Sequence, residues 1–255
     1  MILTIDIGNS TIVLGGVEGE KVCFECRINT DRVKTSDTYA IDLKTLFEIY
    51  GSGLGSIEGV IIASVVPQVF NAVRNAIRKL LQLEPLVVEP GLKTGLNIRL
   101  ENPAQMGADL VAADVAALRE YKPPLIIIDM GTATTISVLD GTGAHLGGCV
   151  CPGVKISLDA LTGRTALLPG IQLESPKQAL GRNTGDAMRS GIMFGTAAML
   201  DGMIDRYREE LNTEFSILAT GGIARHIIPL CRHEINYDRH LIIKGLAALY
   251  RDNAR

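Results

Sequence analysis

The chain has 255 residues, of which 47% are hydrophobic and 21% are charged, and its net charge is −3. This length and apolar fraction support one large core or two medium ones. A weakly negative chain with 4% aromatic residues and no tryptophan lacks the basic surface and stacking platforms of nucleic-acid binders. No apolar run reaches the roughly 18 residues of a membrane span, and the first residues lack the basic region of a signal peptide. We therefore expect a cytoplasmic protein that binds neither nucleic acid nor membrane.

Five cysteines, an odd number in a chain of this size, indicate a reducing compartment rather than a set of disulfides. Two close pairs, Cys23/Cys26 and Cys149/Cys151, have spacings that also occur in metal sites. Both pairs lie in strand-like runs, and Cys-x-Cys is a poor spacing for a zinc knuckle. A structural role is therefore favoured over a zinc site. The four histidines form no metal-binding motif.

One pattern occurs twice in the chain, about half a chain apart. Residues 2–20 contain an apolar strand, the turn Asp-Ile-Gly-Asn-Ser-Thr and a second apolar strand. Residues 125–143 repeat this order around the turn Asp-Met-Gly-Thr-Ala-Thr-Thr. Each copy predicts a β-hairpin with polar residues at its tip.

Helical and strand-like patterns follow each hairpin. The first is followed by a predicted helix over residues 38–50, a strand over 59–66 and a helix over 69–81. The second is followed by predicted helices over 158–166 and 186–211 and a strand over 215–219; apolar residues of the long helix recur every three or four positions. We therefore predict two α/β domains, residues 1–115 and 116–255, each a mixed sheet flanked by helices.

The hairpin tips suggest phosphate binding. Glycine allows close backbone approach, and its neighbours offer N–H and hydroxyl donors. Asp6 and Asp129 follow apolar strand residues, where a carboxylate is costly unless it is hydrogen-bonded or near a cation such as nucleotide-bound Mg²⁺. Either aspartate alone could simply cap its turn, but two copies in matching contexts favour phosphate binding. Gly221-Gly222, between a strand and a predicted helix, is a third turn where backbone amides could meet a nucleotide.

The order Asp-x-Gly-Asn, Asp-x-Gly-Thr and a late Thr-Gly-Gly resembles that of the acetate kinase, sugar kinase, heat-shock protein and actin superfamily. More narrowly, the chain resembles the type III pantothenate kinases. The resemblance runs nearly end to end and includes residues 6–13, 63–67, 91–97, 102–103, 107–109, 129–135, 147–148, 152–153, 183–184 and 244–246. It implies two similar domains of the actin and ribonuclease-H kind, each a mixed sheet flanked by helices, with a cleft between them.

The resemblance also implies an activity: ATP-dependent phosphorylation of a small primary alcohol, pantothenate, to 4′-phosphopantothenate, the first step of coenzyme A biosynthesis. Asp6 would lie near the Mg²⁺ of ATP, and Asp129 would help to bind a monovalent cation, K⁺ or NH₄⁺. A homodimer with active sites near the subunit interface is expected. With the late Gly-Gly turn included, the expected ATP-binding residues are Asp6, Ile7, Gly8, Asn9, Ser10, Thr11, Ile12, Val13, Thr132, Gly221 and Gly222.

By the same resemblance, Asp109 would accept the proton of the attacking hydroxyl, although its position before a helical run also suits an N-cap. Leu100 and Leu110 stand where the family has a tyrosine and an arginine, and losing the arginine removes a contact worth roughly 1.5–3 kcal/mol. The expected substrate-pocket residues are Leu100, Gly107, Ala108, Asp109, Leu110 and Thr184.

The two leucines leave three alternatives open. The chain is a pantothenate kinase in which Arg99 or Lys155 supplies the missing charge, a paralogue that acts on a less anionic alcohol, or a nucleotide-binding regulator without catalytic activity.

Overall fold

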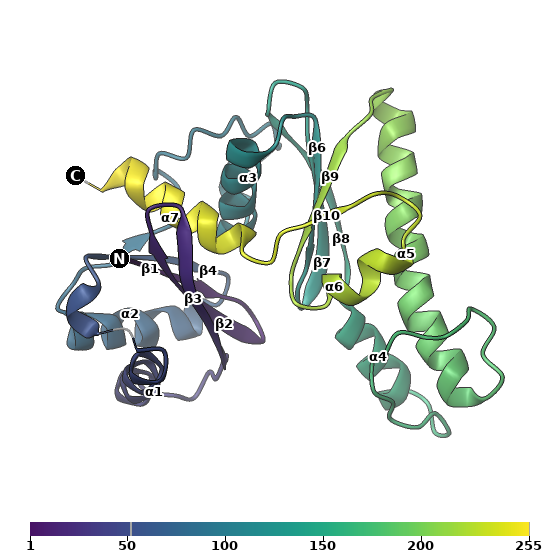
Figure 1. Cartoon of the computed structure of the whole chain (residues 1–255), viewed down its shortest axis with the longest axis horizontal. Coiled ribbons are helices and arrows are strands. Elements are labelled where there is room, and N and C mark those ends of the chain that lie inside the picture. Colours follow the sequence, from purple (N-terminus) through teal and green to yellow (C-terminus); the bar gives the residue numbers. More distant parts are fainter. Residues whose placement is uncertain (52, 255) are drawn as a thin grey trace. The chain divides into compact units, whose positions relative to one another are not determined.

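Two five-stranded sheets, each begun by a hairpin that carries an aspartate, form the framework of the computed structural model, which describes residues 1–51 and 53–254 (Figure 1). Each sheet belongs to a separate compact unit of the chain. Unit 1 consists of Met1–Leu96, Glu101–Glu120 and His240–Arg255, and unit 2 consists of Asn97–Leu100 and Tyr121–Arg239.

The sheet of unit 1 has the strand order β3-β2-β1-β4-β5. β1 pairs antiparallel with β2 and parallel with β4, so the sheet is mixed. The chain leaves the first hairpin through β3, passes through two helices around β4, and ends the sheet at the short β5. The bounds are β1 Ile2–Ile7, β2 Thr11–Glu18, β3 Lys21–Asn29, α1 Ser36–Ile49, η1 Leu54–Ser56, β4 Gly59–Ser64, α2 Pro67–Leu81 and β5 Leu86–Val87.

Strand alternation gives the sheet of unit 1 two apolar faces. Ile5, Ile7 and Ile62 lie in the core under α1 and α2, which pack against each other (Figure 1). Ile61 and Ala63, which alternate with them along β4, lie in a second core with α3 (Ala108–Glu120) and α7 (Leu241–Asn253). Successive side chains of a strand point to opposite faces, so this one sheet is covered by helices on both sides.

The last helix returns to unit 1. α7 packs on β1, β4 and α3, although a division of the chain at residue 115 assigns it to the second half. Its approach to α3 is close, because a Cβ atom at Gly245 would stand 1.8 Å from the carbonyl oxygen of Ala112. Two helix backbones can come this near only where a small residue faces the partner. The C-terminal segment is therefore part of the first core.

The sheet of unit 2 repeats this plan with the order β10-β9-β6-β7-β8. β6 pairs antiparallel with β7 and parallel with β9, as β1 does with β2 and β4. The predicted pair of mixed sheets is thus confirmed. The bounds are η2 Pro103–Gln105 in unit 1, then β6 Leu125–Met130, β7 Ala133–Leu139, β8 His145–Pro152, α4 Val154–Gly163, α5 Thr184–Leu211, β9 Ser216–Thr220, α6 Ala224–Ile227, η3 Ile228–Leu230 and β10 Asn236–Tyr237.

α5 covers one face of the second sheet (Figure 1). Asn183 caps its start, where the side chain accepts a hydrogen bond from the N–H of Asp186, and Asn212 ends it in the left-handed conformation. Its buried side chains include Met193, Leu200 and Ile204, which lie in one core with alternate residues of β6 and β7. Helical spacing of apolar residues therefore predicted this helix within two residues at its start.

Two predicted helices differ from the observed ones. α4 begins at Val154, four residues before the predicted start, because Gly153 serves as its N-cap directly after β8. The helix expected after Gly221-Gly222 is one turn long, since Pro229 lies in the 3₁₀ turn that ends it. Among the helices of the described residues, none combines the length and apolar character that crossing a membrane requires.

Candidate active site

The first hairpin turn consists of Gly8, Asn9 and Ser10 between β1 and β2. The N–H of Gly8 donates a hydrogen bond to the carbonyl oxygen of Thr11 over 3.1 Å. Asn9 and Ser10 at the tip are exposed. The turn therefore presents backbone and polar side-chain groups to solvent, which is what a phosphate-binding turn requires.

Asp6 lies on the face of the sheet of unit 1 that α3 and α7 cover. Its neighbours Ile5 and Ile7 point into the core under α1 and α2, so alternation turns the Asp6 side chain to the other face. It pairs across the sheet with Val13 on β2 and Ala63 on β4. The side chain is half-buried at the end of β1, where the hairpin turn begins.

The start of α3 covers the same face of the sheet of unit 1. Ala63 shares a core with Ala108 and Val111 of this helix. Asp109, in the first turn, accepts a hydrogen bond from the N–H of Leu110 with its Oδ1 over 2.9 Å. A Cβ atom at Gly107 would stand 2.4 Å from the same Oδ1, so glycine leaves room for the carboxylate. Asp6 and the helix that carries Asp109 therefore belong to one side of unit 1.

Asp129 occupies in unit 2 the place that Asp6 has in unit 1. It pairs with Thr135 on β7 and with Thr220 on β9. Ile128 and Met130 lie in the core under α5, so Asp129 is on the opposite face. The Oγ1 atom of Thr135 is buried and has no hydrogen-bond partner among the described residues. A carboxylate beside an unsatisfied hydroxyl oxygen is a set of donors suited to a cation.

Two glycines pack against the backbone of the tip of the second hairpin. Gly221 has a φ of +96°, and a Cβ atom there would stand 2.5 Å from the carbonyl oxygen of Met130. A Cβ atom at Gly153 would stand 2.1 Å from the carbonyl oxygen of Thr132 and 2.8 Å from that of Gly131. Asp129, expected to bind a monovalent cation, and Thr132 and Gly221, expected to bind ATP, thus lie at one end of this sheet.

Gly153 also packs against the tip of this hairpin, although it lies outside the residues expected to bind ATP or substrate. It is one of many positions at which the chain resembles the family. A Pro-Gly pair before a helix predicts a turn, but its contact with Thr132 depends on β8 lying beside β7, which the sequence pattern does not state.

Two of the expected substrate residues belong to unit 2 and lie in different places. Thr184 is the exposed first residue of α5. Leu100 ends a segment that runs beside the start of β8. Its Cδ2 is 3.7 Å from the position that a Cβ atom at Gly147 would occupy. The tip of the hairpin, by contrast, pairs with Pro152 at the other end of β8. At the rise per residue of a strand, Pro152 lies roughly 17 Å from Gly147. Unit 2 therefore does not bring Leu100 next to Thr132.

The two basic residues that could supply the charge missing at position 110 have different surroundings. Arg99 pairs with Asp140, Nη1 to Oδ2, over 3.0 Å. The pKa of Asp140 is lowered, first by the hydrogen bond from the Thr142 hydroxyl and further by backbone N–H groups and Arg99. Lys155, on the first turn of α4, is exposed. Arg99 therefore already has a carboxylate partner within unit 2.

The cysteine pairs differ in geometry. Cys23 is exposed and Cys26 is buried. Burial, with a smaller contribution from Glu25, raises the pKa of Cys26 to about 11. The Sγ atoms of Cys149 and Cys151 lie 3.9 Å apart. Within residues 1–51 and 53–254, histidine, cysteine, aspartate and glutamate side chains form no group of three that could hold a metal ion.

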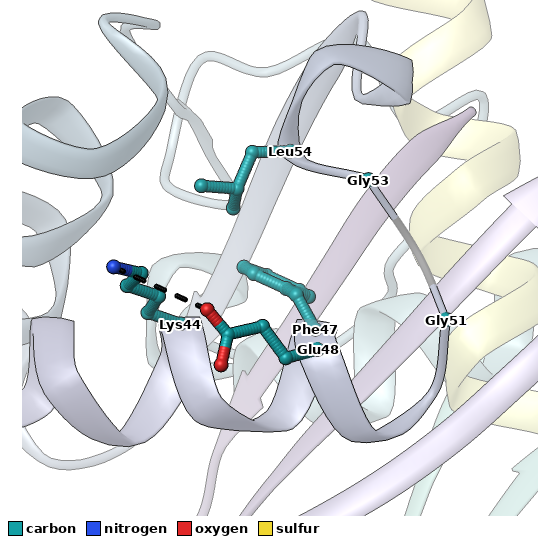
Figure 2. Close-up of a pocket in the computed structure, with 6 residues that line it drawn as sticks. All are labelled: Lys44, Phe47, Glu48, Gly51, Gly53 and Leu54. Carbon is teal, nitrogen blue, oxygen red and sulfur yellow. Dashed lines mark ion pairs between the residues drawn. The ribbon is translucent and has the colours of Figure 1, made fainter.

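A hollow of about 360 Å³ lies at the end of α1 and is lined by none of the expected site residues. In Figure 2, Phe47 and Leu54 face it, with the ion pair between Lys44 and Glu48 at its side. A second hollow, of about 380 Å³, lies beside β5. The expected site residues line neither hollow, so we assign neither to the active site.

Two sequence comparisons with known proteins agree on one family. A profile described as type III pantothenate kinase matches residues 2–206. The type III pantothenate kinase of Bacillus cytotoxicus is 42% identical over 254 residues, which cover 100% of this chain and 97% of that protein. The one from Exiguobacterium sp. is 41% identical over 255 residues and 100% of both proteins.

A solved structure supports the fold. Component A of (R)-2-hydroxyglutaryl-CoA dehydratase from Acidaminococcus fermentans has a TM-score of 0.59 and 12% identity, over 100% of this chain and 99% of that one. At this identity the likeness concerns the fold alone, and it agrees with the two mixed sheets flanked by helices. The predicted cleft between the units stays a prediction. The sequence comparisons establish that the chain belongs to the type III pantothenate kinase family.

Proposed function

We propose that this chain transfers the γ-phosphoryl group of ATP to the primary hydroxyl of pantothenate and forms 4′-phosphopantothenate for coenzyme A biosynthesis. Membership of the type III pantothenate kinase family supports the reaction. The structural observation that carries the proposal is within unit 1: Asp6, at the hairpin turn, lies on the sheet face that the helix bearing Asp109 covers. A phosphate-binding turn and a candidate base then belong to one surface.

The residues proposed to bind the nucleotide are residues 6–13, Thr132, Gly221 and Gly222. The exposed side chain of Asn9 offers an amide donor to phosphate oxygens. The positive φ of Gly221 and its contact with Met130 fix a turn that a side chain would obstruct. These features support phosphate binding at both hairpins, as the repeat suggests.

Asp109 would act as the general base. Phosphoryl transfer depends mainly on positioning and on charge stabilisation, so one carboxylate near the attacking hydroxyl suffices. The Oδ1 of Asp109 accepts the N–H of Leu110, which holds the carboxylate in one orientation. The other oxygen, Oδ2, would then receive the proton of the substrate alcohol.

The side chains present fit the expected cations. Because no group of three acidic or soft ligands occurs in the described residues, Mg²⁺ would be bound chiefly by ATP phosphates, with Asp6 nearby. Asp129 and the unsatisfied Oγ1 of Thr135 would contribute to a site for K⁺ or NH₄⁺. Such cations neutralise the charge that develops on the transferred phosphoryl group.

The residues proposed to contact the substrate are Gly107, Ala108, Asp109 and Leu110, with Leu100 and Thr184 as further expected contacts. Leu110, next to Asp109, is half-buried and carries no charge for the pantothenate carboxylate. This observation favours a second candidate function, in which the chain phosphorylates a less anionic alcohol. A regulator that binds nucleotide without turnover is the third.

We further propose a homodimer in the cytoplasm. Gly191, Gly195 and Gly202 on α5 are exposed, and Cβ atoms there would meet nothing within 4 Å, so this surface has room for a partner helix. The five cysteines are all free thiols, as in a reducing compartment. Size-exclusion chromatography with light scattering tests the dimer; a monomer at micromolar concentration contradicts it.

A substrate panel tests the activity. ADP release would be measured with ATP, Mg²⁺ and either K⁺ or Na⁺, for pantothenate, for alcohols of similar size without a carboxylate, and for no acceptor. We expect pantothenate to give the highest kcat/KM. A higher kcat/KM for an uncharged alcohol selects the second candidate, and ATP binding without turnover on any acceptor selects the regulator.

A further inference from the structure

Thr30 binds both ends of the first hairpin turn. It is the first residue after β3, and its Oγ1 donates a hydrogen bond of 2.6 Å to the carbonyl oxygen of Gly8. Its backbone N–H donates a second one, of 3.1 Å, to the carbonyl oxygen of Ser10. Thr30 is half-buried, so both bonds are partly shielded from competing water.

These two bonds determine where the amides of the turn point. In a trans peptide the carbonyl oxygen of one residue and the N–H of the next lie on opposite sides of the same plane. Holding the Gly8 oxygen toward Thr30 therefore turns the Asn9 N–H away from it. Holding the Ser10 oxygen toward Thr30 does the same for the Thr11 N–H. Two donors are thus aimed at the side of the turn opposite Thr30.

The residue after Thr30 is itself anchored in the core. The hydroxyl of Tyr39 donates to the carbonyl oxygen of Asp31 over 2.7 Å and accepts the Asp31 N–H over 3.1 Å. The ring of Tyr39 is fully buried between β-sheet and helix in the core under α1 and α2. Burial also raises the pKa of this phenol above its usual range. Thr30 therefore has a fixed support.

We propose that Thr30 is a positioning residue for ATP: it orients the turn at Gly8, Asn9 and Ser10 so that backbone amides meet the nucleotide phosphates. The inference rests on the proposed function, in which this turn binds ATP. It adds a residue outside the repeated motif, which acts through the backbone of the turn and does not touch the substrate. The hydrogen bonds between Asp31 and the buried Tyr39 fix the backbone next to Thr30 against the core.

The test compares Thr30→Val, which keeps the shape and removes the hydroxyl, with Thr30→Ser, which keeps the hydroxyl. Thr45→Val is the matched control, because Thr45 is an exposed residue of α1 whose hydroxyl bonds only its own helix, at the Ile41 carbonyl. Steady-state kinetics give KM for ATP, KM for pantothenate and kcat, and calorimetry gives the Kd of Mg·ATP without turnover.

Thr30→Val is expected to raise the KM and the Kd for ATP about 5- to 10-fold, the size of one hydrogen bond. KM for pantothenate should stay within twofold of the wild type, and Thr30→Ser should restore most of the ATP affinity. Thr45→Val should leave every parameter unchanged. A change of KM for ATP without one for the second substrate separates positioning of the turn from a general loss of structure.

Wild-type ATP affinity in Thr30→Val overturns the inference, as does an equal rise of both KM values. If the wild type binds ATP but turns over no alcohol, the proposed function fails, and the Kd values still decide the role of Thr30. If the wild type binds no ATP, both proposals fail.

Discussion

Gly153 lies against the backbone of Thr132, so that a Cβ atom at position 153 would stand 2.1 Å from the Thr132 carbonyl oxygen. Gly153 is also the N-cap of α4, directly after β8. The end of the edge strand therefore holds the tip of the hairpin that carries Asp129. No side chain larger than hydrogen fits at this contact without moving one of the two backbones.

Gly153→Ala is expected to lower the free energy of unfolding by about 1–3 kcal/mol, the usual cost of forcing an added methyl into a packed site. It should also raise KM for ATP, since the tip at Gly131 and Thr132 must shift. Urea denaturation and steady-state kinetics measure the two effects. Gly163→Ala, on the last residue of the same helix, meets nothing within 4 Å and is the control. Equal stability of the two variants would contradict the contact.

Gly221→Ala combines two penalties. Its φ of +96° is a conformation that residues with a Cβ atom rarely adopt, and the methyl would approach the backbone of Met130 to 2.5 Å. We expect a loss of about 2–4 kcal/mol of stability and weaker binding of Mg·ATP. Gly141→Ala, at an exposed position after β7 where a Cβ atom would meet nothing within 4 Å, should change neither. Thermal unfolding and calorimetry give the answer, and a Gly221→Ala protein with normal stability would show that the turn can relax.

Asp109→Asn is expected to lower kcat by at least ~10²-fold, the size of a lost general base. The asparagine amide oxygen can still accept the N–H of Leu110, so stability should remain near that of the wild type. KM for ATP should change little, since the nucleotide is assigned to the hairpin turns. Turnover close to the wild-type rate would remove Asp109 from the role of base.

Leu110→Arg tests the meaning of the altered pocket. If the chain is a pantothenate kinase with a weakened carboxylate contact, an arginine should lower KM for pantothenate on the order of ten- to a hundredfold. Uncharged alcohols should gain nothing, because they lack the carboxylate that the guanidinium would bind. Kinetics on both substrate classes measure this difference. A variant that loses activity on pantothenate would place position 110 outside the carboxylate pocket.

Asp129→Asn should weaken the response to K⁺. The carboxylate sits beside the unsatisfied Oγ1 of Thr135, and removing its charge removes the strongest ligand for a monovalent cation. The K⁺ concentration that gives half-maximal activity is expected to rise at least tenfold. Activity that is independent of K⁺ in the wild type would exclude a cation role for this residue.

Much of the fold could be predicted from the sequence because its local patterns agree with the elements that the structure contains. The apolar runs around Asp6 and Asp129 predicted both hairpins, and the three- and four-residue spacing of α5 predicted a long helix. Neither pattern indicates that α7 packs on β1 in unit 1, since that contact joins the two ends of the chain. Gly245 permits it by facing Ala112 without a side chain.

The candidate site was predictable where function lies in a motif and not where it depends on neighbours distant in sequence. Gly8 and Gly221 lie in turns that the local sequence motifs predict. Thr30 is an ordinary polar residue at a strand end, and its bonds to Gly8 and Ser10 arise only because β3 pairs with β2. Gly153 is similar, since its partner Thr132 is reached through the pairing of β7 with β8.

The most direct test of the account is product analysis after incubating the wild-type protein with ATP, Mg²⁺, K⁺ and pantothenate. Mass spectrometry and ADP quantification should show one ADP formed for each 4′-phosphopantothenate, with no ADP formed when pantothenate is left out. Folded protein that binds Mg·ATP but yields no phosphorylated pantothenate would contradict the proposed function.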